Sequence, residues 1–322
     1  MIRILIAALS ILAATGPALA QKVGIGAWEN PRMNMIHWIE DAPGVGWYYN
    51  WRPDQMYTQS RVRRDVEFVP MIHGAKDVNK RIRSDLRVRH LLAFNEPDGG
   101  SGSHQANMSV AEAVRLWPQL ERRGLRLSSP ATTQGQTLGR NSWQRRFMDQ
   151  AEAKGLRVDF MAVHYYSTTG NVNEFRNWLH AVYREYRRPI WVTEFAFIDW
   201  NRPQAASYAQ NARFIQQAML MMESLPFVER YAWFAANPYP WNGRAPRINL
   251  VQNDLTPTPV GMAFDQTLSQ ISGTRIAAAK STRAKPARTP KPEPVAQLAS
   301  PVARLASFDD RRAKPPRDIF VR

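Results

Sequence analysis

The feature that most constrains this chain is an alternation, repeated eight times, of a short apolar run with a longer stretch of helical periodicity. Each apolar run is nearly continuous, as parallel strands buried on both faces are. Strand-then-helix alternation favours a parallel sheet, and eight repeats in about 250 residues favour its closure into a (β/α)8 barrel. The eight expected strands cover residues 22–28, 45–51, 67–73, 90–96, 126–132, 159–166, 189–197 and 229–235.

Helix signals lie between these runs. Ser109 and Glu112 have the spacing of a capping box, and apolar residues then recur at helical spacing as far as Leu120. Similar periodicity covers residues 142–154, which end before Gly155, and residues 172–186 and 204–224. A doubly wound open sheet is the alternative, but residues 24–26 place their glycines within the first strand and open no helix. The predicted fold class is therefore α/β, a single (β/α)8 TIM barrel.

The two ends of the chain have a different composition from its centre. Residues 1–20 combine Arg3, an apolar run and a small-x-small site at 18–20, which predicts a secretory signal peptide and a secreted or periplasmic protein. Residues 273–322 are rich in Ala, Pro, Lys and Arg, which predicts a disordered basic tail. The catalytic domain is then expected over residues 21–272. Without cysteine, its stability must come from a packed core.

The net charge of +16 is concentrated in the tail. The tail has 12 basic and 4 acidic residues, or +8, and Arg3 belongs to the signal peptide, so +7 remains for residues 21–272. Arginine pairs spread along the chain are typical of solvated helix ends, so we expect no nucleic-acid partner. The tail is expected either to touch anionic envelope surfaces or to act as an inert linker, and no transmembrane segment is expected after signal cleavage.

Polar and aromatic residues gather where the expected strands end, which in a barrel of this kind is the functional face. Glu96 ends the fourth run and Glu194 lies in the seventh. Two carboxylates facing each other across the barrel mouth can lie about 5 Å apart, the separation typical of retaining glycosidases. Nearby Trp and Tyr rings offer flat faces for sugar stacking, and Asn and His can hydrogen-bond hydroxyls. The strand ends therefore predict a sugar-cleaving site.

The same segments resemble a known family. Residues 47–51 (WYYNW), 68–74 (FVPMIHG), 91–98 (LLAFNEPD) and 191–195 (WVTEF) are similar to glycoside hydrolase family 128, as are residues 106–109, 159–164 and 231–234. This family comprises β-1,3-glucanases in the clan of retaining (β/α)8 glycosidases. The resemblance extends from about Val23 to Gln270 and keeps the motifs in order. The sixth strand departs from the family pattern, because it reads His-Tyr-Tyr at residues 164–166 instead of His-Trp-Tyr.

The resemblance implies roles for particular residues. Glu96 would be the acid/base, protonated because the charge of Glu194 raises its pKa, and Glu194 would be the nucleophile. Asn95 would bind the sugar 2-hydroxyl, and Trp233 would lie under the sugar being cleaved. Neighbouring subsites would be lined by Trp47, Tyr49, Asn50, Trp51, His73, His164 and Tyr166. The substrate would be a β-glucan polysaccharide or oligosaccharide, most simply a β-1,3-glucan.

The sequence lacks the motifs of several other classes of function. The six histidines have no metal-binding spacing, residues 99–102 lack the Lys-Ser/Thr of a phosphate loop, and no serine nucleophile motif is present, so no metal and no cofactor are expected. Two alternatives remain open from the sequence. One is the same chemistry on another envelope polysaccharide or exopolysaccharide, and the other is a glycan-binding barrel that has lost catalysis.

Overall fold

The computed structural model describes residues 22–57, 61–100, 104–239 and 243–284. The predicted signal peptide and the tail beyond residue 284 lie outside the described residues. The elements are, in chain order, β1 Val23–Gly26, α1 Met35–Asp41, β2 Trp47–Tyr49, β3 Glu67–Phe68, β4 His90–Leu91, α2 Val110–Glu121, β5 Arg126–Leu127, α3 Trp143–Ala153, β6 Met161–Ser167, α4 Val172–Tyr186, β7 Ile190–Phe197, α5 Tyr208–Glu223, β8 Val228–Phe234 and α6 Pro259–Ala284, with short 3-10 turns at Ala75–Asp77 and Gln134–Gln136. Strands and helices alternate as the sequence predicts except from β2 to β4, where the described residues include no α-helix and only the 3-10 turn Ala75–Asp77.

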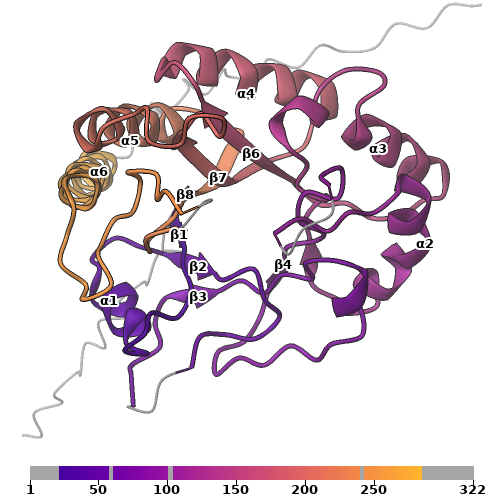
Figure 1. The fold of residues 1–322 in the computed structure, drawn as a ribbon, viewed down its shortest axis with the longest axis horizontal. Coiled ribbons are helices and arrows are strands. Elements are labelled where there is room, and N and C mark those ends of the chain that lie inside the picture. Colours follow the sequence, from indigo (N-terminus) through magenta and orange to yellow (C-terminus); the bar gives the residue numbers. More distant parts are fainter. Residues whose placement is uncertain (1–21, 58–60, 101–103, 240–242, 285–322) are drawn as a thin grey trace, which may run out of the picture. The chain divides into compact units, whose positions relative to one another are not determined.

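The strands form a parallel barrel. Six of them lie in the order β3-β2-β1-β8-β7-β6, and β4 pairs with β5. Single parallel bridges join these two sheets, between Met71 and Leu92 on one side and between Ser128 and Phe160 on the other. The eight strands therefore close into a ring, and Figure 1 shows α2 to α5 lying outside the strands. The predicted (β/α)8 barrel is confirmed.

The interior of the ring is filled by side chains from different strands. The inner cluster comprises Trp47, Tyr49, Val69, Met71, Leu92, Phe160, Trp191 and Ala232. Strand β1 makes room for the largest rings by having no side chains at two positions. A Cβ atom on Gly24 would lie 2.3 Å from Cε2 of Trp47, and one on Gly26 would lie 2.6 Å from Cη2 of Trp51. The barrel is thus a packed core, on which the strand ends are held rigidly.

An ion-pair network lies at the strand starts, where the inner cluster ends. Glu67 of β3 contacts Nδ1 of His90 at 2.6 Å and Nη2 of Arg230 at 2.7 Å. The Arg230 guanidinium lies 4.4 Å from the centre of a Trp191 ring. On the same side, Arg126 of β5 binds both carboxylate oxygens of Glu229 at 2.7 and 3.0 Å. These contacts connect β3, β4, β5 and β8 across the base of the ring.

The helices follow the sequence signals with two corrections. Ser109 caps α2 by accepting from the Glu112 amide, and α4 has the bounds predicted for it. The helix expected from residue 204 instead begins at Tyr208, because Ser207 and Gln210 form a capping box there. Helix α6 continues to Ala284, past residue 273 where the tail was expected to begin, and Arg275 of that helix binds both oxygens of Glu223 at 2.9 and 2.8 Å.

Candidate active site

A cleft of about 1260 Å³ opens at the carboxyl ends of the strands. Each strand of the barrel points its last residues toward this face, so residues distant in the sequence meet there. The cleft is lined by Trp28, Asn50, Trp51, Arg52, Pro53, His73, Lys76, Asp77, Lys80, Asn95, Glu96, His104, Gln105, Thr133, Gln134, Gly135, Tyr166, Thr168, Glu194, Ile198, Asp199, Trp200, Asn201, Phe234 and Tyr239.

Glu96 lies beyond β4, at a backbone φ of 41°. Its amide donates to the Ala131 carbonyl at 2.7 Å, which anchors the turn to the next strand of the ring. Its Oε1 lies 3.0 Å from Nδ1 of His164, and its Oε2 accepts from Nε2 of Gln105 at 2.9 Å. The Glu96 side chain is 15% exposed, so the carboxylate reaches the cleft while both of its oxygens are oriented by neighbours.

Glu194 lies within β7 and is more deeply buried, with 5% of its side chain exposed. Its Oε1 accepts from Nε1 of Trp51 at 2.8 Å, and its Oε2 accepts a short hydrogen bond from the Tyr166 hydroxyl. Trp51 follows β2 and Tyr166 belongs to β6, so donors from two strands fix the carboxylate. Donors of this kind favour the ionised form of a carboxyl group.

His164 of β6 lies between the two glutamates and is completely buried. Its Nδ1 is 3.0 Å from Glu96 and 3.4 Å from Oε2 of Glu194. One carboxylate oxygen of each glutamate and one His164 nitrogen all lie within 4.8 Å of one another. The ring nitrogen Nε2 of His164 is buried without a hydrogen-bond partner among the described residues, so the Nδ1–H tautomer is the one that serves the carboxylates.

The three groups shift one another's protonation. Burial raises the pKa of Glu194 above its usual value, and the charge of Glu96 adds to this effect. Burial acts on Glu96 in the same direction, but His164 and Gln105 outweigh it and hold the pKa of Glu96 below its usual value. Burial lowers the pKa of His164, yet both glutamates outweigh it and the net shift is upward. The expectation that repulsion raises the pKa of Glu96 is thus wrong for the free site, because its hydrogen-bond donors dominate.

Aromatic rings from separate strands and loops form one wall of the cleft. The Phe234 ring centre lies 5.8 Å from Trp51, 5.7 Å from Tyr166 and 5.2 Å from Tyr239. Trp200 lies 5.1 Å from Tyr166 and completes the wall above β7. Such a wall beside two carboxylates matches the chemistry of a carbohydrate site, in which ring faces stack on sugars and acids act on the glycosidic bond.

Comparison with known proteins assigns this arrangement to a family. A family model described as the glycosyl hydrolase catalytic core matches residues 26–264. The chain belongs to this glycosyl hydrolase family. Its expected resemblance to glycoside hydrolase family 128 is also confirmed, since solved members of that family match nearly over their whole length. The protein is accordingly a glycoside hydrolase.

Two of these solved relatives are bacterial. The hydrolase is 34% identical to a variant of a subgroup I endo-β-1,3-glucanase from Amycolatopsis mediterranei in complex with laminaripentaose, with a TM-score of 0.64 over 76% of this chain and 98% of that one. It is 27% identical to a subgroup II endo-β-1,3-glucanase from Sorangium cellulosum, with a TM-score of 0.60 over 76% and 98% of the two chains. A curated relative, alkali-sensitive linkage protein 1 of Schizosaccharomyces pombe, is 27% identical over 197 residues, and the hydrolase matches only 34% of its length.

The hydrolase brings several of the sequence-predicted binding residues to the cleft. Asn50, Trp51, His73, Asn95 and Tyr166 all line it. They come from the ends of different strands, as the sequence predicts. Their contact with a substrate stays a prediction.

Four other predicted binding residues lie elsewhere. Trp47 and Tyr49 belong to the inner core below the cleft, where the Tyr49 hydroxyl donates to the Thr193 carbonyl at 2.8 Å. His164 lies beneath the glutamates and does not line the cleft. Trp233 is fully buried between β8 and α5, and its Nε1 donates to the Ile248 carbonyl at 2.7 Å. A ring that is wholly enclosed has no face free for a sugar, so the prediction of Trp233 as the sugar platform is corrected.

The hydrolase uses cleft residues that the sequence predictions missed. Phe234 takes the place expected for Trp233, and Trp28, Trp200 and Tyr239 extend the aromatic wall. Gln105, the donor to Glu96, lies in a Gly/Ser-rich loop where no periodicity marks it. In the structure Phe234 shares a strand face with Ala232, which faces the barrel interior, but the apolar run of β8 does not reveal this register in the sequence.

Among the described residues, Glu96, His164 and Glu194 are also the group with the spacing of metal ligands. Their oxygens, however, already accept hydrogen bonds from Gln105, Trp51 and Tyr166. Donor hydrogens pointing at the same oxygens would repel a cation placed there. The hydrogen-bonding pattern therefore favours a carboxylate pair that works without a metal, and the absence of a cofactor stays a prediction.

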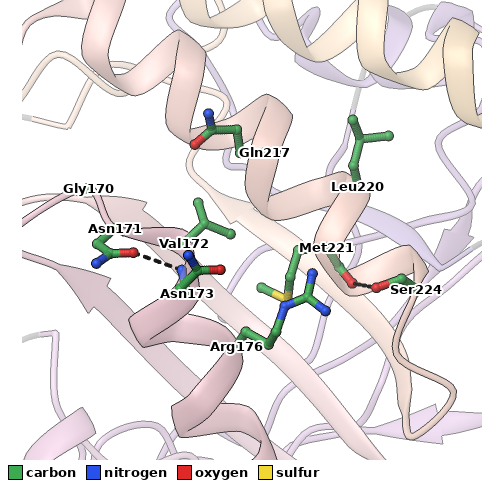
Figure 2. Close-up of a pocket in the computed structure, with 9 residues that line it drawn as sticks. All are labelled: Gly170, Asn171, Val172, Asn173, Arg176, Gln217, Leu220, Met221 and Ser224. Atoms are coloured by element: carbon green, nitrogen blue, oxygen red, sulfur yellow. Dashed lines mark hydrogen bonds between the residues drawn. The ribbon is translucent and has the colours of Figure 1, made fainter.

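A second hollow lies in the helical layer, between the start of α4 and the end of α5. Figure 2 shows its lining side chains, with Asn171 accepting from the Asn173 amide and Ser224 donating to the Met221 carbonyl. Arg176 is the one charged side chain among its lining residues, which include no carboxylate, and the Ser224 hydroxyl donates to a backbone carbonyl with no histidine among the lining residues to activate it. This hollow therefore lacks the groups that hydrolysis needs.

No described helix combines the length and the apolar character needed to cross a membrane.

Proposed function

We propose that this hydrolase cleaves β-1,3-glucan by double displacement, with retention of the anomeric configuration. The observation that carries the proposal is the short gap between the two glutamates, whose nearest oxygens lie within 4.8 Å. Retaining glycosidases have carboxyl groups about 5 to 5.5 Å apart, whereas inverting ones need about 6.5 to 9.5 Å to admit a water. A gap of this size leaves room for an anomeric carbon but not for an additional water.

Glu194 is proposed as the nucleophile. The donors from Trp51 and Tyr166 hold its two oxygens and stabilise its charge once substrate is bound. Attack of one oxygen on the anomeric carbon forms the glycosyl-enzyme ester and breaks the bond to the leaving oxygen. The deep burial of Glu194 suits this step, because the ester is then shielded from water on that side.

Glu96 is proposed as the acid/base. It is the more exposed of the two carboxyls, so water can reach it when the second step requires a base. The acid role requires a proton on Glu96 when substrate is bound, although the donors around Glu96 lower its pKa in the free site. That proton moves to the leaving oxygen through Glu96 when Glu194 attacks, and Glu96 then takes a proton from the water that cleaves the ester.

Two cleft residues are proposed to hold the reacting sugar. Nδ2 of Asn95 donates to the His104 carbonyl at 3.0 Å, which fixes the orientation of the amide. The Asn95 Oδ1 atom is buried without a hydrogen-bond partner among the described residues, so it can accept from a sugar hydroxyl. Phe234 supplies the ring on which that sugar stacks.

The choice of β-1,3-glucan is supported by the relatives, since those from Amycolatopsis mediterranei and Sorangium cellulosum are endo-β-1,3-glucanases.

Export is proposed from residues 1–20, and a mature protein that begins at Gln21 would support it. The contact of the basic tail with anionic envelope surfaces remains a proposal of the same kind.

Azide rescue tests the two roles. Glu194→Ala should abolish hydrolysis of an activated laminari-oligosaccharide, and added azide should restore cleavage with an α-glycosyl azide as product. Glu96→Ala should instead yield a β-glycosyl azide from a substrate with a good leaving group, because Glu194 still forms the intermediate. Hydrolysis of the unactivated oligosaccharide by either variant at the wild-type rate would contradict the assignment.

A further inference from the structure

The walls of the cleft differ in charge. Over β6, β7 and β8 the lining is aromatic, whereas over β2 and β3 it contains three cations, Arg52, Lys76 and Lys80. Arg52 directly follows Trp51, and both lysines belong to the loop after β3. In an eight-stranded ring, β2 and β3 lie across from β6 and β7. A sugar chain that crosses the catalytic pair can thus meet an aromatic surface on one side and a basic one on the other.

Arg52 has a fixed backbone and a free head group. Its carbonyl accepts from the Met71 amide at 3.0 Å, which ties the loop after β2 to the loop after β3. The Arg52 side chain is 66% exposed, and the contact of its guanidinium with Glu29 is 3.9 Å long, at the limit of an ion pair. Such a weak contact leaves the charge available to a ligand.

The two lysines are held at the rim by the 3-10 turn Ala75–Asp77. Lys80 lies 2.6 Å from the carboxylate of Asp77, which is buried, while the Lys80 side chain is 56% exposed. Lys76 is exposed and forms no ion pair with any described acid. Against these three cations, Asp77 is the one acid of this wall that lines the cleft, since Asp199 lies beyond β7 and binds Arg202 at 3.0 Å.

We propose that this basic wall binds anionic substituents, such as carboxylates or acidic esters, on a β-glucan chain. The inference rests on the proposed function, because it adds a substrate class to the same cleft. Exposed charges of one sign in a concave site attract and orient an anionic ligand, an attraction that a neutral glucan does not experience. Guanidinium and ammonium groups also donate strong hydrogen bonds to such anions.

The experiment compares two substrates of matched length, an unmodified soluble β-1,3-glucan and a partly carboxymethylated one. The double variant Arg52→Gln/Lys76→Gln removes both free cations and keeps the Lys80–Asp77 pair, so that no buried acid is left unpaired. The ratio of kcat/KM for the carboxymethylated substrate to that for the neutral one should fall about tenfold, the size expected when two exposed charge contacts are lost. Added salt should lower the wild-type ratio in the same direction.

Lys154→Gln is the matched control, since Lys154 ends α3 and does not line the cleft, and it should leave the ratio unchanged. Lys76→Glu alone, at an exposed position that folding tolerates, should lower the ratio further than Lys76→Gln. If none of these changes alters the ratio, the anionic substrate class is overturned. It is also overturned if the wild-type enzyme cleaves only the neutral glucan. Wild-type inactivity on both substrates would contradict the proposed function itself.

Discussion

At the scale of single residues, catalysis depends on how the Glu96 carboxylate is held. Gln105 reaches back along its own loop to donate to Oε2. The loop can bring Gln105 so close only because residue 99 is glycine, since a Cβ atom there would lie 2.2 Å from Cδ of Gln105. The Gly/Ser-rich segment that follows Glu96 is thus a means of positioning one hydrogen-bond donor.

Replacing Gln105 should therefore change the pH dependence as well as the rate. Gln105→Leu removes a donor that favours ionised Glu96, so the pKa of Glu96 rises. Glu96 must be protonated to act as the acid, so the basic limb of the kcat/KM profile moves to higher pH. The loss in kcat should be about tenfold, as for loss of one oriented donor. Gly99→Ala should reproduce both effects by displacing Gln105. Gly100→Ala is the control, because no atom of the described residues lies within 4 Å of its added Cβ, and an equal effect there would refute the positioning role.

Phe234 and Trp233 offer a test of which neighbouring ring meets the sugar. Phe234→Ala should lower kcat/KM for laminari-oligosaccharides by about tenfold to a hundredfold, because a stacking surface worth roughly 1.5 to 3 kcal/mol is lost. Trp233→Phe should instead lower the free energy of unfolding by about 1 to 3 kcal/mol, since the buried Ile248 carbonyl loses its donor. Steady-state kinetics and chemical denaturation separate these effects. The reverse outcome would restore Trp233 as the platform.

At the scale of elements, sequence patterns predicted the strands but not which side chain of each reaches the cleft. In β2, Trp47 and Tyr49 point inward at two successive levels, and only the residues beyond the strand, among them Asn50 and Trp51, line the cleft. In β8, the choice between Trp233 and Phe234 depends on register, which a continuous apolar run leaves undetermined. Glu96 and Glu194 were predictable because a carboxylate at the end of an apolar strand is costly to bury without a function.

The network at the strand starts should contribute to stability in a pH-dependent way. Burial raises the pKa of Glu67, but His90 and Arg230 outweigh it and the net shift is downward. A lowered pKa adds stability that is present above the unfolded-state pKa of about 4.3 and is lost as pH falls through the lower folded-state value. Glu67→Gln should cost about 2 to 4 kcal/mol at pH 7 and flatten the decline in stability below pH 5.

Urea denaturation at pH 7 and pH 4 measures both effects. The control is Asp65→Asn, which removes the exposed ion pair between Arg63 and Asp65 and should change stability by less than about 0.5 kcal/mol. If Glu67→Gln were as mild as this control, the network would not hold the base of the barrel.

At the scale of the whole molecule, the eightfold alternation sufficed to predict the barrel, because each strand–helix unit buries its apolar surface against the same central sheet. The end of the domain was less predictable. The Ala- and Lys-rich composition after residue 273 suits a solvated helix as well as a disordered segment, and only the contact of Arg275 with Glu223 shows that α6 continues past that point. Contacts between such distant residues have no signature in local composition.

The barrel also explains why the two glutamates work together although they are distant in the sequence. Strands β4 and β7 bring them to one mouth, and β6 places His164 between them. The resulting short gap is the basis of the proposed retaining mechanism.

The most direct test of that mechanism is proton NMR of the anomeric signals during the first minutes of laminari-oligosaccharide hydrolysis, before mutarotation. A gap that excludes an additional water predicts that the β-anomer of the new reducing end appears first and the α-anomer follows by mutarotation. Initial appearance of the α-anomer would show inversion and would contradict the account of Glu194 as a nucleophile.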